Sequence, residues 1–228
     1  MRLETRWREE DGARLAATVW RTGPGLRAIS SALLGGGIGP VGWVLNAQVP
    51  GGYARLDPQA HLRELADAYG LRGRGVAMMT AASVDRTVRA EDEGVAVSAT
   101  VGLRVPTWAA APPGAADPEL APVRLDGTAP GTINIVVAVP VPLGDAALVN
   151  AVVTATEAKT QALLEAGWSC TGTASDAICV AAPAVPESGG AEPFAGPRST
   201  WGARIARAVH AAVHAGAVDY AARLRDRG

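Results

Sequence analysis

The sequence predicts a mixed α/β (α+β) fold, one compact domain over residues 1–228 with a buried central sheet and flanking helices. Hydrophobic residues make up 48% of the chain, and a domain of this length can bury ~70% of its unfolded surface without disulfides or metals. Short β-branched runs and longer helical segments are interleaved, but not in strict alternation. Because no linker separates two complete cores, one domain fits better than two.

The first half of the chain combines four apolar runs with one helix. The predicted strands cover residues 14–21, 28–34, 75–82 and 94–103. The second run ends in a glycine cluster at 35–39, which allows close approach of another group. A helix is predicted over 61–69, because Asp57-Pro58 is a typical helix start and Gly70 a typical stop.

The second half is more regular. Residues 132–141 form a dense β-branched run, typical of a central strand buried on both faces. A long helix follows over 146–166 and ends at Gly167. A second buried strand is predicted at 177–182 and a terminal helix at 200–225. Two stretches rich in Pro, Ala and Gly, near 106–130 and 183–197, are predicted surface loops.

Composition and charge exclude several classes of protein. The net charge is −1, from 21 Lys and Arg against 22 Asp and Glu, so no nucleic-acid partner is expected. No apolar run approaches the ~20 residues of a membrane span. The first eleven residues are charged and unlike a signal peptide, which favours a cytoplasmic protein. Cys170 and Cys179 are too few for a disulfide framework and lack zinc-site spacing.

Familiar catalytic motifs are missing. The chain has no Gly-x-Ser-x-Gly elbow, no His-Glu-x-x-His helix and no Walker loop after its glycine cluster. Of the three histidines, His61 is predicted to be solvated on a surface helix. His210 and His214 are four residues apart on one helix, but without a third ligand we expect no metal site.

The cations are unevenly divided. The chain has twenty arginines and one lysine, Lys159, which suggests that an ammonium group matters there, because the two side chains differ in shape and hydration. The alternative is that Lys159 is a chance survivor on a solvated face. The same predicted helix carries a polar stripe on one face, formed by Asn150, Thr154, Glu157 and Gln161.

Small polar residues also precede the two most buried strands. Thr132 and Asn134 open the first, and Thr171-Gly172-Thr173-Ala174-Ser175-Asp176 leads into the second. Loops at strand ends collect ligand-binding groups in α/β sheets. We therefore expect a ligand site here.

Eight groups of residues, in this order, resemble the adenosylcobinamide amidohydrolase family. The similarity extends from about residue 28 to the terminal helix and is most specific at 131–135 (Gly-Thr-Ile-Asn-Ile) and 154–160 (Thr-Ala-Thr-Glu-Ala-Lys-Thr). Residues 103–108, Leu-Arg-Val-Pro-Thr-Trp, depart from the small polar residues often found there. The groups are Ser30-Ser31-Ala32, Gly35-Gly36-Gly37, Asn46, 79–82, 100–102, 131–135, 154–160 and 171–177.

The resemblance implies a hydrolase acting on a linear amide, which converts adenosylcobinamide to adenosylcobyric acid and aminopropanol in cobamide salvage. Such a reaction needs a nucleophile, an oxyanion stabiliser and a proton donor. We predict Glu157 as general base and Asp176 as the residue that orients the base or donates a proton. Lys159 is predicted either to stabilise the oxyanion or to lower the pKa of a neighbouring hydroxyl. Because Glu157 and Lys159 are two residues apart, they cannot share one face of a regular helix. The implied substrate-binding residues are Ser31, Gly36, Gly37, Asn46, Thr80, Thr100, Thr132, Asn134, Thr156, Thr171 and Thr173.

Several alternatives stay open. Direct attack by Thr156, Thr132 or Ser31 competes with attack by water. The cobalt corrinoid is the expected partner and substrate, with no further cofactor. The sequence does not distinguish a monomer from a homo-oligomer. A second hypothesis is a corrinoid-binding protein without catalysis. A third is an amidase or acyltransferase with an autoproteolytic Ser or Thr, because the order of a Gly-Thr-Ile strand, a long helix and an Asp-Ala-Ile strand is similar to that group.

Overall fold

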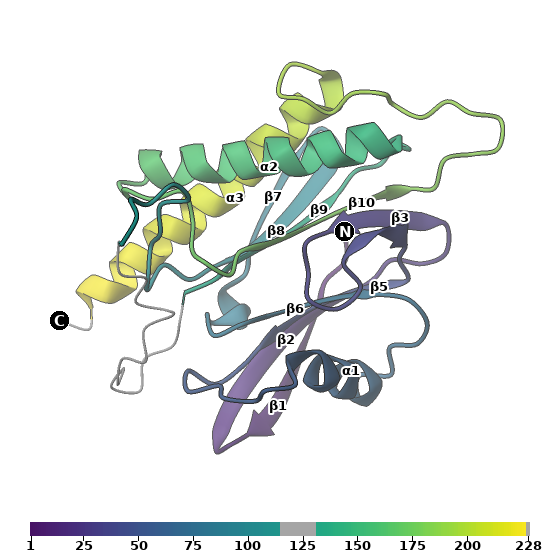
Figure 1. Cartoon of the computed structure of the whole chain (residues 1–228). Coiled ribbons are helices and arrows are strands. Elements are labelled where there is room, and N and C mark those ends of the chain that lie inside the picture. Colours follow the sequence, from purple (N-terminus) through teal and green to yellow (C-terminus); the bar gives the residue numbers. More distant parts are fainter. Residues whose placement is uncertain (115–130, 227–228) are drawn as a thin grey trace.

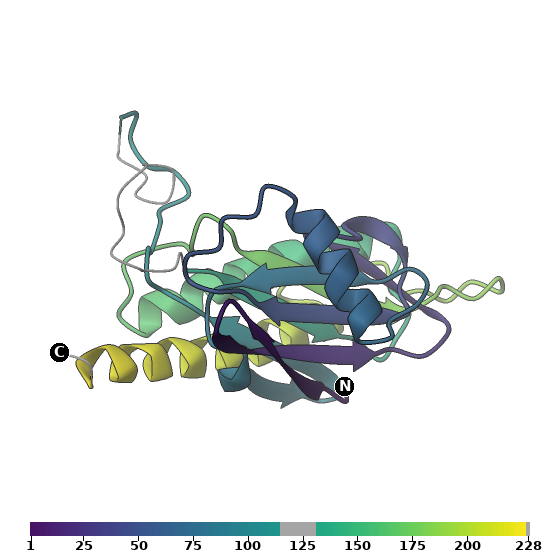
Figure 2. The ribbon, with the colours of Figure 1, turned by 90° about the horizontal axis from the view of Figure 1, so that it is seen from below.

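The computed structural model describes residues 1–114 and 131–226, which form four layers (Figure 1). Helices α2 (Asp145–Glu165) and α3 (Thr200–Arg225) cover one face of a six-stranded sheet. A four-stranded sheet packs against its other face, and α1 (Pro58–Ala68) covers the outside of that second sheet. Figure 2 shows α1 and the smaller sheet from below. The mixed α/β fold is confirmed, with two sheets in place of one.

The six-stranded sheet has the order β4-β3-β10-β9-β8-β7. Only the central pair, β9 and β10, is parallel, and the other neighbours are antiparallel. Both central strands therefore start at the same end of the sheet, where the residues that precede β9 and β10 lie side by side. The strands are β3 (Leu26–Ser30), β4 (Gly37–Pro40), β7 (Val88–Asp92), β8 (Val95–Val101), β9 (Ile133–Ala138) and β10 (Ala177–Pro183).

The smaller sheet has the order β1-β2-β5-β6, with a parallel β5–β6 pair at one edge. One of its faces packs on the central strands and the other on α1. A short 3-10 helix, η1 (Val84–Arg86), follows β6. The strands are β1 (Glu4–Glu10), β2 (Ala13–Arg21), β5 (Trp43–Gln48) and β6 (Val76–Thr80).

Alternation along the central strands decides which side chains meet which layer. In β9, Ile133 and Ile135 face the helices, whereas Asn134 and Val136 face the smaller sheet. Since successive side chains of a strand point to opposite faces, the residue before β10, Asp176, points toward α2. The same geometry places its neighbour Ser175 on the other side.

Most predicted elements are confirmed, with shifted ends. The terminal helix has the predicted bounds, α1 begins three residues earlier than predicted, and the run predicted to 34 is a strand only to Ser30. The loop at 183–197 has no helix or strand beyond Pro183, and of the loop near 106–130, residues 115–130 lie outside the described part. Four strands were not predicted: β1, β4, β5 and β7.

Candidate active site

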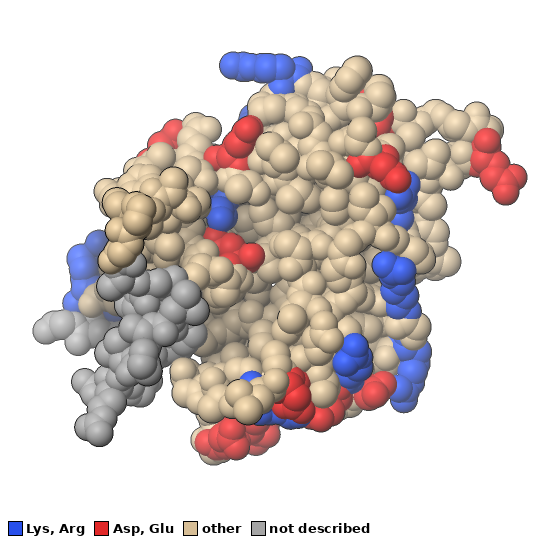
Figure 3. Space-filling model, in the orientation of Figure 1, with Lys and Arg blue, Asp and Glu red and all other residues tan. Residues whose placement is uncertain are grey.

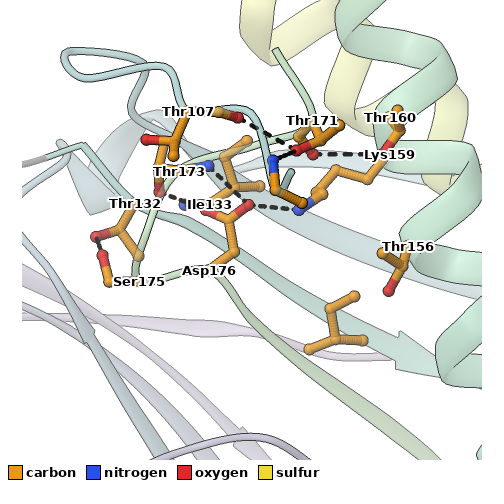
Figure 4. Close-up of polar contacts among 12 residues, drawn as sticks. Thr107, Thr132, Ile133, Thr156, Lys159, Thr160, Thr171, Thr173, Ser175 and Asp176 are labelled. Carbon is orange, nitrogen blue, oxygen red and sulfur yellow. Dashed lines mark hydrogen bonds and ion pairs between the residues drawn. The ribbon is translucent and has the colours of Figure 1, made fainter. Parts of the chain in front are cut away.

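The centre of the site is an ion pair between the single lysine and Asp176. Lys159 lies on the inner face of α2, and its Nζ is 2.5 Å from Oδ2 of Asp176, which ends the loop before β10 (Figure 4). The two side chains are only 8% and 10% exposed. A solvated helix face is therefore excluded as the environment of Lys159.

Three further hydrogen bonds hold the Asp176 carboxylate. Its Oδ1 accepts the backbone N–H of Ile133 at 2.9 Å and the hydroxyl of Thr173 at 2.5 Å. Its Oδ2 also accepts the N–H of Thr173 at 3.1 Å. The carboxylate thus ties the start of β9, the loop before β10 and α2 together. Such a fully bonded carboxylate is fixed in orientation.

Gly172 lies directly over this pair. A Cβ atom at this position would collide with both the Asp176 carboxylate and the Lys159 ammonium. A larger residue at this position would therefore displace the ion pair from its present geometry.

Lys159 borders a cleft of about 1010 Å³, at the upper end of the ~300–1,000 Å³ of small-molecule sites. One wall is the segment 106–112, and the other is formed by α2 and the loop before β10. The residues of that second wall are Thr156, Lys159, Thr160, Thr171, Gly172, Thr173 and Ala174.

A second polar cluster is buried between the two sheets. Asn134 Nδ2 donates to Asn46 Oδ1 at 2.7 Å, and Asn46 Nδ2 donates to Thr100 Oγ1 at 2.9 Å. The Asn134 amide also donates to the Met79 carbonyl at 3.1 Å, while its own Oδ1 is buried and has no hydrogen-bond partner among the described residues. This cluster joins β5 of one sheet to β8 and β9 of the other.

A hydroxyl pair lies at the same edge of the sheet. Thr132 Oγ1 and Ser175 Oγ are 2.8 Å apart, and Ser175 also donates to the Gly131 carbonyl at 3.3 Å. Figure 4 shows this pair on the far side of Asp176 from Lys159.

The predicted site residues therefore fall into separate groups. Lys159, Asp176, Thr156, Thr171 and Thr173 meet at the cleft. Ser31 accepts the Ile178 N–H beside the start of β10, and Gly36 and Gly37 are exposed around the edge strand β4. The residues buried between the sheets or at their edge are Asn46, Thr80, Thr100, Thr132 and Asn134.

Glu157 is exposed on the outer side of α2 and does not line the cleft. The prediction that it cannot share a face with Lys159 is confirmed. The Asn150–Gln161 stripe is only partly exposed, because Thr154 is buried and donates to the Ala195 carbonyl at 2.8 Å.

Sequence reasoning missed several cleft residues. Thr107, Trp108 and Thr160 line it, Gly172 covers the ion pair, and Ser175 meets Thr132. Thr160 lies one position beyond Lys159 in the matched heptad, so the motif itself carried that signal.

The histidines and cysteines are not arranged for catalysis in this cleft. His61 is buried, not solvated as predicted, because its Nδ1 pairs with the Tyr53 hydroxyl at 3.0 Å and its ring stacks on Tyr53. Burial raises the pKa of the Cys170 thiol, and it raises that of Cys179 to about 12. Because the thiolate is the reactive form and a raised pKa disfavours it, neither cysteine is an activated nucleophile.

The pair His210 and His214 stacks at 5.8 Å, and His210 Nε2 lies 2.7 Å from Glu165. Over residues 1–114 and 131–226, no three His, Cys, Asp or Glu side chains form a group that could hold a metal ion. No helix in that part of the chain is long and apolar enough to cross a membrane.

Comparison with known proteins identifies the family. The family model for adenosylcobinamide amidohydrolase matches residues 3–224. An adenosylcobinamide amidohydrolase from Methanosarcina mazei is 30% identical over 189 residues, which cover 80% of this chain and 86% of that protein. With nearly the whole length matched, the chain belongs to the adenosylcobinamide amidohydrolase family.

Proposed function

We propose that this protein, as an adenosylcobinamide amidohydrolase of corrinoid salvage, cleaves its substrate at the Lys159–Asp176 pair. The bond cleaved is the amide between the propionate arm of the corrin ring and aminopropanol, and the products are adenosylcobyric acid and aminopropanol. The observation that carries the proposal is the chain's one lysine, buried and ion-paired beside a wide cleft.

Lys159 is suited to stabilise the oxyanion of the tetrahedral intermediate. Its ammonium is a compact donor, and Asp176 holds it in place at 2.5 Å. A fixed positive donor in a site with little water stabilises developing negative charge more than the same group in water. In this scheme Asp176 orients Lys159 and accepts a proton, whereas the sequence predicts that it orients the general base or donates a proton.

The best-placed nucleophile along the cleft is the Thr173 hydroxyl. It donates to Asp176 at 2.5 Å, and Lys159 orients that carboxylate in turn, which is the arrangement of an activated hydroxyl. Thr173 Oγ would bond to the carbonyl carbon, its proton would pass through Asp176 to the amide nitrogen, and aminopropanol would leave. Water would then hydrolyse the resulting ester. A water activated by Glu157 remains the competing route, and it requires the substrate to extend over the outer side of α2.

Thr132 supports a second candidate, an amidase with an autoproteolytic threonine. The Ser175 hydroxyl contacts both Thr132 Oγ1 and the Gly131 carbonyl that Thr132 would attack. Attack would move the Gly131 acyl group from the Thr132 nitrogen to its oxygen, and hydrolysis would leave a new amino terminus at Thr132. The intact mass separates the two: a single 23.2 kDa chain counts against self-cleavage, and two fragments support it.

The test of the function is incubation with adenosylcobinamide, followed by mass analysis for adenosylcobyric acid and aminopropanol. Thr173→Val should abolish turnover and Thr173→Ser should retain part of it. Tight binding of adenosylcobinamide without any product would overturn the hydrolase and leave a corrinoid-binding protein. We also propose a cytoplasmic location, because the two cysteines are unpaired, as is typical of a reducing compartment.

A further inference from the structure

An exposed tryptophan stands on the wall of the cleft opposite the catalytic pair. Trp108 lines the cleft and is 49% exposed. Burying an aromatic side chain of this size against a ligand releases a large apolar area from water. A half-exposed tryptophan beside a polar site therefore indicates a ligand with an apolar face.

The backbone on both sides of Trp108 is fixed to the loop that covers Lys159. Thr107 donates its N–H to the Gly172 carbonyl at 2.8 Å and accepts the Thr171 N–H at 3.0 Å. On the other side, Ala109 N–H donates to Thr171 Oγ1 at 2.8 Å. The position of Trp108 relative to Lys159 is thus set before a ligand binds, which lowers the entropic cost of binding.

The side chains that line the cleft further limit the kinds of ligand that would fit it. Among the described residues that line the cleft, Lys159 is the one with an ionic side chain, and it is already paired with Asp176. The other polar side chains of the lining are threonine hydroxyls, which both donate and accept hydrogen bonds. Uncharged amide groups around an apolar ring match such a lining, whereas a ligand with several carboxylates does not. Figure 3 shows few charged side chains over the middle of the face seen in Figure 1, with most of them toward its margins.

We propose that Trp108 is a specificity-determining residue that packs against the face of the corrin macrocycle, so that the aminopropanol-bearing arm reaches Lys159. The inference rests on the proposed function for the identity of the ring. It assigns the task of holding the substrate to Trp108 on the wall formed by residues 106–112, and it gives Trp108 no part in the bond-breaking step.

The experiment compares Trp108→Ala and Trp108→Phe with the control Trp7→Ala. Trp7 is also exposed, at 44%, but lies on β1 under Arg14 and away from the cleft. For adenosylcobinamide we expect Trp108→Ala to raise KM about tenfold or more while kcat stays within about threefold, the pattern of lost binding without lost chemistry. Trp108→Phe should recover most of the affinity, and Trp7→Ala should match the wild type.

Equilibrium dialysis measures the Kd of adenosylcobinamide independently of turnover, so it tests the Trp108 contact separately from the proposed hydrolase function. If no variant forms product, the hydrolase proposal fails, and an approximately tenfold weaker Kd in Trp108→Ala alone still supports the ring contact. An unchanged KM and Kd in Trp108→Ala would overturn the contact. A fall in kcat with an unchanged Kd would also overturn it, because it would place Trp108 in the catalytic step.

Discussion

At the scale of single residues, the burial of Lys159 has an energetic cost that a surface role would not require. An ammonium group loses hydration when buried, and an ion pair repays this only with good geometry and further hydrogen bonds. Lys159 is 6% exposed, and its partner Asp176 accepts three other hydrogen bonds. In a chain that otherwise uses arginine, this arrangement favours a function for the smaller cation.

Lys159→Arg tests that function. The guanidinium keeps the charge but is wider and planar, so it does not reproduce the compact contact of the buried ammonium with Asp176. We expect turnover of adenosylcobinamide to fall about tenfold or more, roughly 1.4 kcal/mol, with a melting temperature near that of the wild type. Full activity in Lys159→Arg would mean that lysine has no functional advantage over arginine at this position.

Asp176→Asn removes the charge of the partner and keeps its shape. The amide oxygen can still accept the Ile133 N–H, so the start of β9 should stay in place. Since Lys159 loses its counter-charge and Thr173 its base, we expect turnover to drop at least about tenfold, or ~1.4 kcal/mol. A melting curve checks the fold, and wild-type rates in the folded variant would make Asp176 structural only.

Glu157→Gln tests whether Glu157, rather than Asp176, acts as the base. A positioned general base contributes ~10²–10⁴-fold, but Glu157 is exposed and outside the lining of the cleft. From this position we expect turnover within about threefold of the wild type, because the substitution preserves volume and helix propensity. A fall of the larger size would show that the substrate reaches this side of α2 and would support Glu157 as the base.

At the scale of elements, hydrophobic periodicity predicted the helices that have one apolar face and the strands that are buried on both faces. The helix at 200–225 and the buried run of β9 fall in this class. The missed strands β1 and β7 carry many charges and alternate between exposed and half-buried positions, as edge strands do. Their pairing is decided by partner strands, which no local pattern in the chain encodes.

Two arginine–aspartate pairs attach α3 to the region around β7. Asp219 on α3 accepts hydrogen bonds from Arg86 of η1, and Arg207 on α3 donates to Asp92 of β7 at 2.6 Å. The hydrogen bonds from Arg86 lower the pKa of Asp219, and those from Arg207 lower the pKa of Asp92. A carboxyl whose pKa is lower in the folded state stabilises the fold above its unfolded pKa and loses that contribution as pH falls.

Asp219→Asn should therefore destabilise the protein in a pH-dependent way. At pH 7 we expect a small loss of unfolding free energy, no more than about 1 kcal/mol, because the pair is partly exposed. The difference from the wild type should shrink as pH falls below about 4, where the unfolded carboxyl is protonated. Urea unfolding at pH 7 and pH 3.5 measures this, and an equal difference at both values would rule out the charge as the cause.

At the scale of the whole molecule, the site forms where segments distant in sequence meet. Lys159 and Asp176 were predicted because their residue types are unusual in their local context. Gly172 and Trp108 were not, because their roles depend on the pairing of Thr107 with Gly172, 65 positions along the chain. For the same reason, the predicted substrate-binding residues Asn46, Thr100 and Asn134 lie away from Lys159, in the layer between the two sheets.

The placement of possible metal-ligating groups in the molecule also determines how we expect its activity to respond to a chelator. In the part of the chain that the structure describes, the groups at the cleft are an ammonium, one fully bonded carboxylate and hydroxyls, a poor set of ligands for a divalent cation. His210 and Glu165 pair with each other at 2.7 Å, and His214 stacks beside them on α3. We expect full turnover of adenosylcobinamide after incubation with EDTA and dialysis before the substrate is added. Loss of activity with rescue by zinc or manganese would contradict this, and His210→Ala and His214→Ala would then locate the metal.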